Sequence, residues 1–468
     1  MDYIDESTIS NIRIAYIGGG SRGWGWGLMS DLVSSPGISG EVLLYDIDPA
    51  AAKNNEIIGN LYNRAEGAVT HWNYRAVPTL DAALTGADFV VISILPGTFD
   101  EMQSDVHTPE EYGIYQSVGD TTGPGGIIRA LRTIPMFEVI ADGIRRCCPD
   151  AWVINYTNPM TVCTRTLYRT FPAVKAFGCC HEVFGTQTLL SCALNRLRRL
   201  ERVPREEIQV NVVGVNHFTW LTSAHYRSMD LFPLYREFCG VCGDDGYNMQ
   251  ADTNWMNSSF RTLEKVKMDL FRRYGLIAAA GDRHLAEFCP GNWYLRDPET
   301  VDRWGFALTP VDWRRADLKL RLEKSRALLS GEKKPVIENT GEDGVRQIRA
   351  ILGLSPLRTN VNLPNAGQIP NLPLGAVVET NADFSADCVS PVLSGEIPRA
   401  VYSLISRICG EQETIVEAGI SRDLSLAFNA FLGDPLVGIS MERARELFNR
   451  MVANTSGYLG MYGRHLSV

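Results

Sequence analysis

The chain has 468 residues, which exceeds one ordinary domain, so we expect two or three lobes that each bury a core of their own. Its 45 basic and 54 acidic residues give a formal charge of −9 without long charged runs, which argues against nucleic acid or a membrane as a partner. A small polar molecule is the expected ligand.

The N-terminal sequence MDYIDESTIS is acidic and polar, and no apolar stretch approaches the roughly 18 to 20 residues that span a bilayer. We therefore expect neither a signal peptide nor a membrane anchor. The eleven cysteines, an odd number, show no repeated C-x-x-C doublets of the kind that hold a structural zinc ion. Reduced thiols and a cytoplasmic location are the expectation.

The first strong pattern covers residues 12–48. IRIAYIGGGSRGWGWGLMSDLV predicts a buried strand, a glycine-rich turn and the start of an amphipathic helix. EVLLYDID then predicts a second strand that ends in acidic residues. This order predicts a βαβ unit of the dinucleotide-binding type.

The turn of this unit carries the cofactor prediction. Gly18, Gly20 and Gly23 match G-x-G-x-x-G, and with Ser21 they are the candidate contacts to a pyrophosphate at the helix N-terminus. Asp46, at the end of the second strand, is placed to accept hydrogen bonds from the adenosine ribose and to repel a 2′-phosphate. We therefore predict NAD rather than NADP.

Three further segments, ADFVVISILPG, AWVINYTNP and AVKAFGCC, each predict a short buried strand, and helical segments separate them. Such alternation predicts an α/β fold with a Rossmann-like, doubly wound parallel sheet, as in lactate and malate dehydrogenases. Ligands of these sheets bind outside the carboxyl ends of the strands. Asn158, before a proline, is thus expected in a loop that faces the cofactor crevice, with an Asx turn as the alternative.

From about residue 200 the pattern changes to strand segments rich in β-branched and aromatic residues, mixed with helical ones. We predict an NAD-binding domain at 1–198 and a mixed α+β domain at 199–468 for substrate binding and oligomerisation. A homodimer or homotetramer is expected.

The stretch CCHE, residues 179–182, raises the question of a metal site. Cys180 as thiolate and His217 as neutral imidazole suit a divalent transition ion, and two protein ligands leave open positions for substrate oxygens. The alternative is that the cysteines fill the core and that the histidine is structural. The spacing between the two residues has no local signature that decides between these interpretations.

Several blocks in the right order, IAYIGGGS, LYDID, VGDTTGPGGIIRALRTIP, NYTNP, GCCHEVFGT, VNHFTWL and GDRHLAEF, are similar to glycoside hydrolase family 4. Members of that family hydrolyse sugars with NAD and a divalent ion, usually manganese, and are exceptions to paired-carboxylate hydrolysis. The similarity covers residues 12 to about 290.

The resemblance implies roles for single positions. Cys180 and His217 fall on the family's metal ligands, and Asn158 on a residue that contacts substrate and cofactor. His181 and Glu182 are then expected to help recognise the sugar. Gly18, Gly20 and Asp46 fall on NAD-binding positions.

The family's chemistry oxidises the sugar at C3, which acidifies the C2 proton and allows elimination at C1, addition of water and re-reduction. Phosphosugar members use a tyrosine base, whereas the corresponding region here offers Asp282, so we predict Asp282 as the base and His181 as the acid. A helix cap, or an ion pair with Arg283 or His284, is the alternative role of Asp282.

The residues after the metal cysteine vary with substrate in the family, and CHEV resembles the α-galacturonidase-like members. α-Glucuronides, α-glucosides and α-galactosides are the alternative substrates, and a 6-phosphate is disfavoured. A uronate carboxylate requires a cation, for which Arg22, Arg129, Arg132 and Arg283 lie near the motif blocks. The rival classes are an NAD-dependent 2-hydroxy acid dehydrogenase and a non-catalytic NAD-binding protein.

Overall fold

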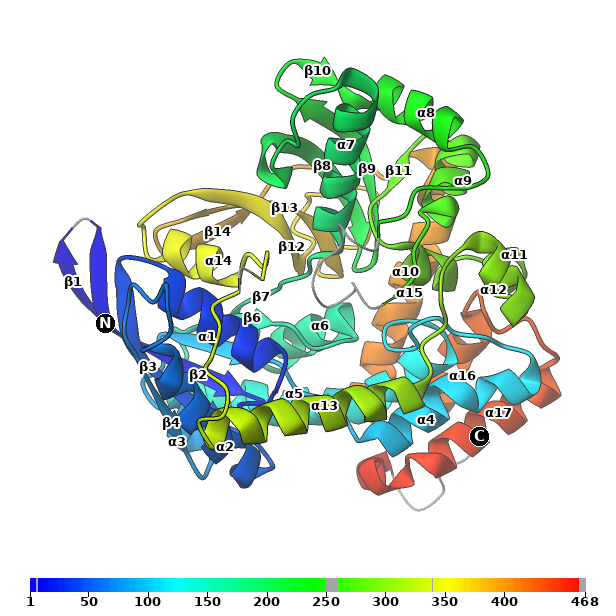
Figure 1. Cartoon of the computed structure of the whole chain (residues 1–468). Coiled ribbons are helices and arrows are strands. Elements are labelled where there is room, and N and C mark those ends of the chain that lie inside the picture. The colour runs from blue at the N-terminus through cyan, green and yellow to red at the C-terminus, as the bar shows by residue number, and fades with distance from the viewer. Residues whose placement is uncertain (6, 250–259, 339, 463–468) are drawn as a thin grey trace.

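The computed structural model describes residues 1–5, 7–249, 260–338 and 340–462. The strands of its main sheet are β1 (Asp2–Asp5), β2 (Thr8–Ile17), β3 (Ile38–Tyr45), β4 (Trp72–Ala76), β5 (Phe89–Ile92), β6 (Trp152–Asn155), β7 (Lys175–Gly178), β12 (Leu357–Pro364), β13 (Val377–Ser385) and β14 (Cys388–Pro391). Their order is β14-β13-β12-β7-β6-β5-β2-β3-β4, and β1 pairs with β2 (Figure 1).

The six strands from β4 to β7 are mutually parallel. Strand β2 lies between β3 and β5, so the direction of winding reverses beside it. Such a switch point opens a crevice at the carboxyl ends of the strands, where doubly wound sheets bind their ligands. The predicted fold class is confirmed.

Helices cover both faces of this sheet, because successive side chains of a strand point to opposite faces. On β2, Ile14 and Tyr16 join the core beneath α1 (Trp24–Ser34), α2 (Pro49–Tyr62) and α14 (Gly344–Ile351). Ala15 and Ile17 join the core beneath α3 (Leu80–Leu84), α5 (Gly123–Cys147) and α6 (Met160–Thr170). Both faces of the strand are therefore apolar, as the continuous run in the sequence predicts.

A second sheet forms the green lobe of Figure 1. It consists of β8 (Ile208–Val215), β9 (Phe218–Tyr226), β10 (Met229–Asp230) and β11 (Ile277–Ala278). Around its core pack α7 (Glu182–Arg198), α8 (Leu231–Cys242) and α9 (Lys265–Tyr274). This lobe is the mixed α+β part that the sequence predicts.

The remaining helices connect the lobes, and several of them lie in the lower part of the molecule in Figure 1. They are α4 (Phe99–His107), α10 (Asp282–Glu287), α11 (Gly291–Tyr294), α12 (Pro298–Trp304), α13 (Val311–Leu329), α15 (Arg399–Ser421), α16 (Leu424–Gly433) and α17 (Met441–Asn454), with short 3-10 turns at Pro109–Tyr112, Arg205–Glu207, Ser456–Tyr458 and Gly460–Tyr462. Helix α15 packs on α5 and α6, and α13 runs from α4 to α2 (Figure 1).

The C-terminal half also contributes to the main sheet. Strand β12 pairs with β7 through Asn362 and Gly178, and β13 and β14 continue the sheet in antiparallel order. The division at residue 198 remains a prediction, while the sheet itself runs across it. Within the described residues, no helix combines the length and the apolar character that crossing a bilayer requires.

Candidate active site

The glycine-rich turn follows β2 at the switch point. Gly18 has a φ of +94°, and a Cβ there would lie 2.1 Å from the carbonyl oxygen of Ser93, so only glycine fits. Gly20 N donates to Asp46 Oδ2 at 2.8 Å, which joins the turn to the end of β3. Gly23 is the N-cap residue of α1 and offers no side chain to the helix amides. The predicted cofactor residues thus surround an open helix N-terminus.

Asn55 on α2 fixes this turn from outside, a contact that the sequence pattern did not reveal. Its amide nitrogen donates to the carbonyl oxygens of Gly19 at 2.8 Å and Ser21 at 2.9 Å, and its oxygen accepts from the Trp26 indole at 2.9 Å. At the start of α1 the Ser21 hydroxyl accepts from Gly25 N at 3.4 Å, and the N-cap Gly23 has no side chain to occupy the other amides, which suit an anion.

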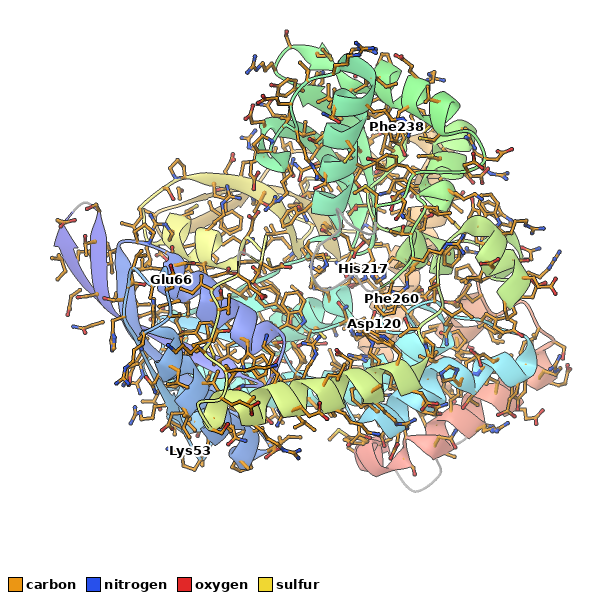
Figure 2. All side chains as sticks on the ribbon, viewed as in Figure 1. Lys53, Glu66, Asp120, His217, Phe238 and Phe260 are labelled. Atoms are coloured by element: carbon orange, nitrogen blue, oxygen red, sulfur yellow. The ribbon has the colours of Figure 1, made fainter. Side chains whose placement is uncertain are left out.

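A polar centre lies between the two sheets, near the middle of the molecule (Figure 2). Asn158, after β6, donates to Asp120 Oδ2 at 3.2 Å. Thr121 donates to Asp120 Oδ1 at 2.7 Å, and its hydroxyl lies 3.1 Å from Nδ1 of His217. His217 occupies the tight turn between β8 and β9 with a φ of +64°, which aims it into the centre. Loops from both lobes therefore meet here.

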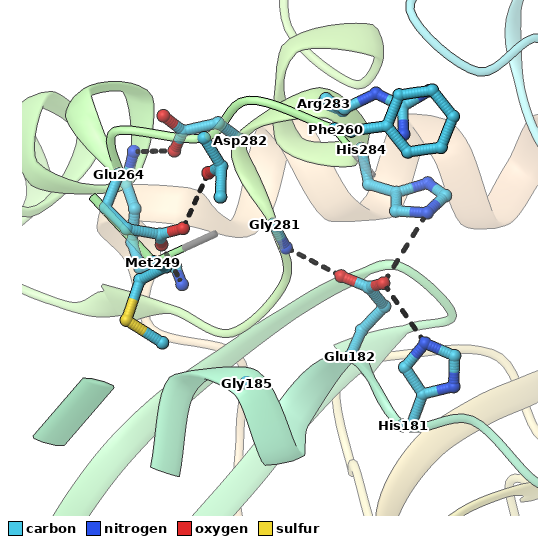
Figure 3. A pocket seen from close by; sticks show the side chains of 12 residues that line it. His181, Glu182, Gly185, Met249, Phe260, Glu264, Gly281, Asp282, Arg283 and His284 are labelled. Carbon is cyan, nitrogen blue, oxygen red and sulfur yellow. Dashed lines mark hydrogen bonds and ion pairs between the residues drawn. The ribbon is translucent and has the colours of Figure 1, made fainter. Parts of the chain in front are cut away.

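Glu182 links two histidines to this centre. Its Oε2 accepts from Gly281 N at 2.7 Å, and its Oε1 lies 3.7 Å from Nε2 of His181 and 3.7 Å from Nε2 of His284 (Figure 3). The ring of His284 in turn lies 3.9 Å from that of His217, centre to centre. Glu182 thus connects the start of α7 to the start of α10.

The protonation states of these histidines differ. Burial, with the charge of His284 beside it, lowers the pKa of His217 to about 3, so its imidazole is neutral and able to bind a metal ion. Burial also opposes the charged form of His181, but Glu342, Glu182 and Glu379 outweigh it and raise the His181 pKa to about 9. One imidazole is therefore a potential ligand and the other a potential proton donor.

Cys180 also belongs to this centre and follows closely after the end of β7. The amide of Asn216 and the carboxyl groups of Glu379 and Glu182 surround its thiol. Glu379, on β13, accepts from Asn360 at 2.6 Å and from Asn216 at 3.1 Å, and Asn360 also donates to the Cys180 carbonyl at 3.1 Å. Since Asn216 directly precedes His217, this network brings the two predicted metal ligands to one place.

The residues present fit an open metal site. Among the described residues, no three His, Cys, Asp or Glu side chains form a closed set of ligands. Three buried polar atoms of the centre, Asn158 Oδ1, Asn216 Oδ1 and His284 Nδ1, have no hydrogen-bond partner in the described part of the chain. A soft thiol, a neutral imidazole and unpaired amide oxygens suit a divalent ion whose other positions bind ligand oxygens.

A cavity of about 610 Å³ adjoins Glu182 and extends along α10 (Figure 3). Its lining residues are His181, Glu182, Gly185, Met249, Phe260, Thr262, Glu264, Lys267, Gly281, Asp282, Arg283 and His284. Part of this space is open to solvent, and His181, Glu182 and His284 belong both to the cavity lining and to the polar centre.

Asp282 lines this cavity, but its carboxylate is turned away from Glu182 and His284 (Figure 3). The side chain is fully buried, and its oxygens accept from the backbone amides of Val266 at 3.2 Å and Lys267 at 3.0 Å, in the first turn of α9. These contacts match the helix-cap alternative and do not support the assignment of Asp282 as the base.

Three of the four arginines near the motifs are held by the protein itself. Arg132 forms a buried ion pair with Asp105, and Arg129 donates to the carbonyl of Asn158 at 3.1 Å. Arg283 donates to the carbonyls of Ala307 at 3.0 Å and Ser117 at 2.8 Å. The fourth, Arg22, belongs to the glycine-rich turn.

Sequence reasoning missed several members of the centre. Asp120 stands in the block VGDTTGPGG, which served only to support the family resemblance, and His284 was considered only as an ion-pair partner. Glu342 and Glu379 come from the C-terminal half, where no motif drew attention to them. The block around Asp120 is the one signal that could have found part of this set.

Comparisons with known proteins agree with this geometry. Residues 13–196 match the model of family 4 glycosyl hydrolases, and residues 212–437 match that of the family's C-terminal domain. An α-galacturonidase of Thermoanaerobacterium saccharolyticum (strain DSM 8691 / JW/SL-YS485) is 60% identical over 459 residues, which is 98% of each chain.

Two solved structures extend the comparison. That of lplD from Bacillus subtilis has a TM-score of 0.90 at 51% identity and covers 95% of this chain and 100% of its own. A 6-phospho-α-glucosidase from gut microorganisms, in complex with NAD and Mn²⁺, has a TM-score of 0.78 at 20% identity and covers 96% of this chain and 99% of its own, which shows the shared fold. With both family models matched in order, the chain belongs to family 4 of the glycosyl hydrolases.

Proposed function

We propose that this glycosyl hydrolase is an α-galacturonidase that uses NAD and a divalent metal ion, with manganese as the first choice. The observation that supports the proposal is the polar centre itself, where the Cys180 thiol and the His217 imidazole lie among unpaired amide oxygens, beside a cavity that Glu182 and His284 line. The high identity to an α-galacturonidase over nearly the whole chain supports the choice of substrate.

Bound NAD would supply reversible hydride transfer, and a bound divalent ion would supply Lewis-acid polarisation of sugar oxygens. Cys180 and His217 are the residues that hold the ion, and Asp46 with the amides at the start of α1 holds the dinucleotide. The presence of NAD and Mn²⁺ in the distant 6-phospho-α-glucosidase supports both assignments.

The chain's own residues then orient the sugar and move protons. Asn158 offers its unpaired oxygen to a sugar hydroxyl, and Asp120 holds the amide of Asn158 in place. His181, flanked by Glu342 at 3.0 Å and by Glu182, is placed to donate a proton to the departing C1 oxygen. Glu182 keeps this imidazole oriented through its bond to Gly281.

We propose that the enzyme is cytoplasmic. The proposed use of NAD and the eleven free cysteines suit a reducing compartment, and no helix of the described residues could span a membrane. We also propose a homodimer or homotetramer, which sedimentation of the purified protein would measure.

The decisive experiment is hydrolysis of α-galacturonides in D₂O, with and without NAD, Mn²⁺ and a thiol reductant. We expect release of galacturonate with deuterium at C2 and no net formation of NADH, because the hydride returns in each cycle. Direct displacement at C1 does not break the bond between C2 and its hydrogen. Steady accumulation of NADH would instead identify a dehydrogenase, and activity without NAD would exclude the proposed route.

A further inference from the structure

Arg314, in the first turn of α13, differs from the other arginines around the centre. It is partly buried, yet its guanidinium makes no hydrogen bond or ion pair with any residue that the structure describes. Its contacts are aromatic, with the Phe260 ring at 5.6 Å and the Trp313 ring at 5.3 Å. The next residue, Arg315, is by contrast paired with Asp100 at 2.7 Å and Asp312 at 3.0 Å.

Arg314 lies beside the cavity, against one of its lining residues. Phe260 lines the cavity, and its ring also carries Arg283 at 3.8 Å (Figure 3). Burial lowers the pKa of Arg314, and the carboxylates of Asp120 and then Asp317 oppose that effect most, so Asp120 lies within electrostatic reach of the guanidinium. The cation therefore lies next to the part of the cavity wall that Phe260 forms.

Arg314 is not required to balance the charge of Asp120. Arg129 has the largest influence that opposes burial and lowers the pKa of Asp120 to about 2. Among the cations that line the cavity, Lys267 is paired with Glu264 at 2.5 Å and His181 with Glu342 at 3.0 Å. Arg283, the other one, is bound to backbone carbonyls. A partly buried guanidinium that makes no hydrogen bond or ion pair gains stability when it binds an anion.

We propose that Arg314 binds the C6 carboxylate of the uronate, which makes it the residue that selects acidic over neutral sugars. This inference rests on the proposed function. The planar guanidinium can donate two parallel hydrogen bonds to a carboxylate, and its aromatic neighbours hold the plane in advance of binding. Neither Asp120 nor Glu182 offers a carboxylate such a partner, because both are anionic.

The test combines one change in the enzyme with one change in the substrate. The enzyme variant is Arg314→Gln, and the substrate is an α-galacturonide either as the free acid or as its C6 methyl ester. Wild type is expected to prefer the acid, and Arg314→Gln to lose about 10²-fold or more in kcat/KM for the acid while changing little for the ester. Arg314→Lys, which keeps the charge but cannot donate two parallel hydrogen bonds, should recover part of the loss. An unchanged preference for the acid in Arg314→Gln, or an equal loss on both substrates, would overturn the proposal.

Arg315→Gln is the matched control on the same helical turn and should leave the acid-to-ester ratio at its wild-type value. A second measurement does not depend on turnover: the rise in Tm caused by galacturonate, glucuronate or galactose at high concentration. Wild type is expected to be stabilised by a uronate more than by galactose, and Arg314→Gln to lose that difference. No difference in wild type would contradict the role of Arg314, whereas failure to hydrolyse galacturonides with a uronate effect intact would contradict only the proposed function.

Discussion

The cofactor side and the sugar side of this enzyme are built in different ways. On the cofactor side, the turn, its acidic partner and the clamping asparagine all lie between Gly18 and Asn55. On the sugar side, the groups come from loops as far apart as Asp120 and Glu379. The first is determined by local backbone geometry, whereas the second exists only when both lobes are folded together.

The largest effect is expected on the sugar side, at the two proposed metal ligands. Chelation, Cys180→Ser or His217→Ala should each reduce turnover by about 10³-fold or more, because a metal ion contributes several kcal/mol of transition-state stabilisation. NAD binding, measured by calorimetry, should stay near its wild-type value, since these residues do not form the turn. A parallel loss of NAD binding would mean that the two sides are not separable.

The reciprocal change is Gly18→Ala on the cofactor side. The added Cβ would lie 2.1 Å from the Ser93 oxygen at a φ of +94°, so the turn must shift away from the strand end. We expect a loss of about 2–5 kcal/mol in unfolding free energy and NAD binding weakened in proportion. Gly185→Ala, where nothing lies within 4 Å of the new Cβ, is the control. Undiminished NAD affinity in Gly18→Ala would contradict the assignment of the turn.

Asp282→Asn separates a base from a helix cap. Because both Asp282 oxygens accept amides of α9, the variant should unfold about 1–2 kcal/mol more easily, as the loss of a cap does. Deuterium incorporation at C2 by the folded fraction should continue at nearly the wild-type rate. Abolished incorporation together with unchanged stability would restore Asp282 as the base.

Asp46→Ala should weaken NAD binding about tenfold and reduce the discrimination against NADP, because the carboxylate that repels a 2′-phosphate is removed. Its bond to Gly20 is lost as well, so Asp46→Asn serves as the variant that retains an acceptor. The ratio of the two cofactor affinities is the measurement. A ratio equal to that of wild type in both variants would place the ribose elsewhere.

The smallest effect concerns a support of the sugar side that lies outside the centre. Asp434 accepts from Gly123 N at 2.8 Å and from Thr122 Oγ at 3.1 Å, which anchors the start of α5 next to the loop of Asp120. Burial beside Asp434 raises the pKa of Glu411 well above its ordinary value of 4.5. The folded protein therefore keeps this proton longer than the unfolded chain, and the stability it contributes is lost as pH rises above 4.5.

Glu411→Gln retains a hydrogen-bond donor without a charge. Its Tm should exceed that of wild type at pH 8 and approach or fall below it at pH 5, which scanning calorimetry over this range would measure. Glu413→Gln is the neighbouring control, because Glu413 instead pairs with Arg165 at 3.0 Å near the surface. A Tm difference that does not vary with pH would contradict the raised pKa of Glu411.

The sequence predicted the sheet, the glycine-rich turn and the family, because apolar runs and glycines at fixed offsets determine local structure directly. It also selected Cys180, His217, His181 and Glu182, which the structure brings to one centre. It did not find Glu379 or Arg314, because their roles depend on the side chains opposite them in the folded chain. Asp282 was assigned from its place in a motif, whereas its contacts are set by α9.

Strand β7 ends against β12, a strand that arrives about 180 residues later in the chain, through the one pair of Gly178 and Asn362. A fragment that ends at residue 198 would contain a complete glycine-rich turn, yet it would leave the edge of β7 without its hydrogen-bonding neighbour. Uncovered edges of apolar strands recruit other chains. A fragment of residues 1–198 that is produced alone should therefore be less soluble than the full chain.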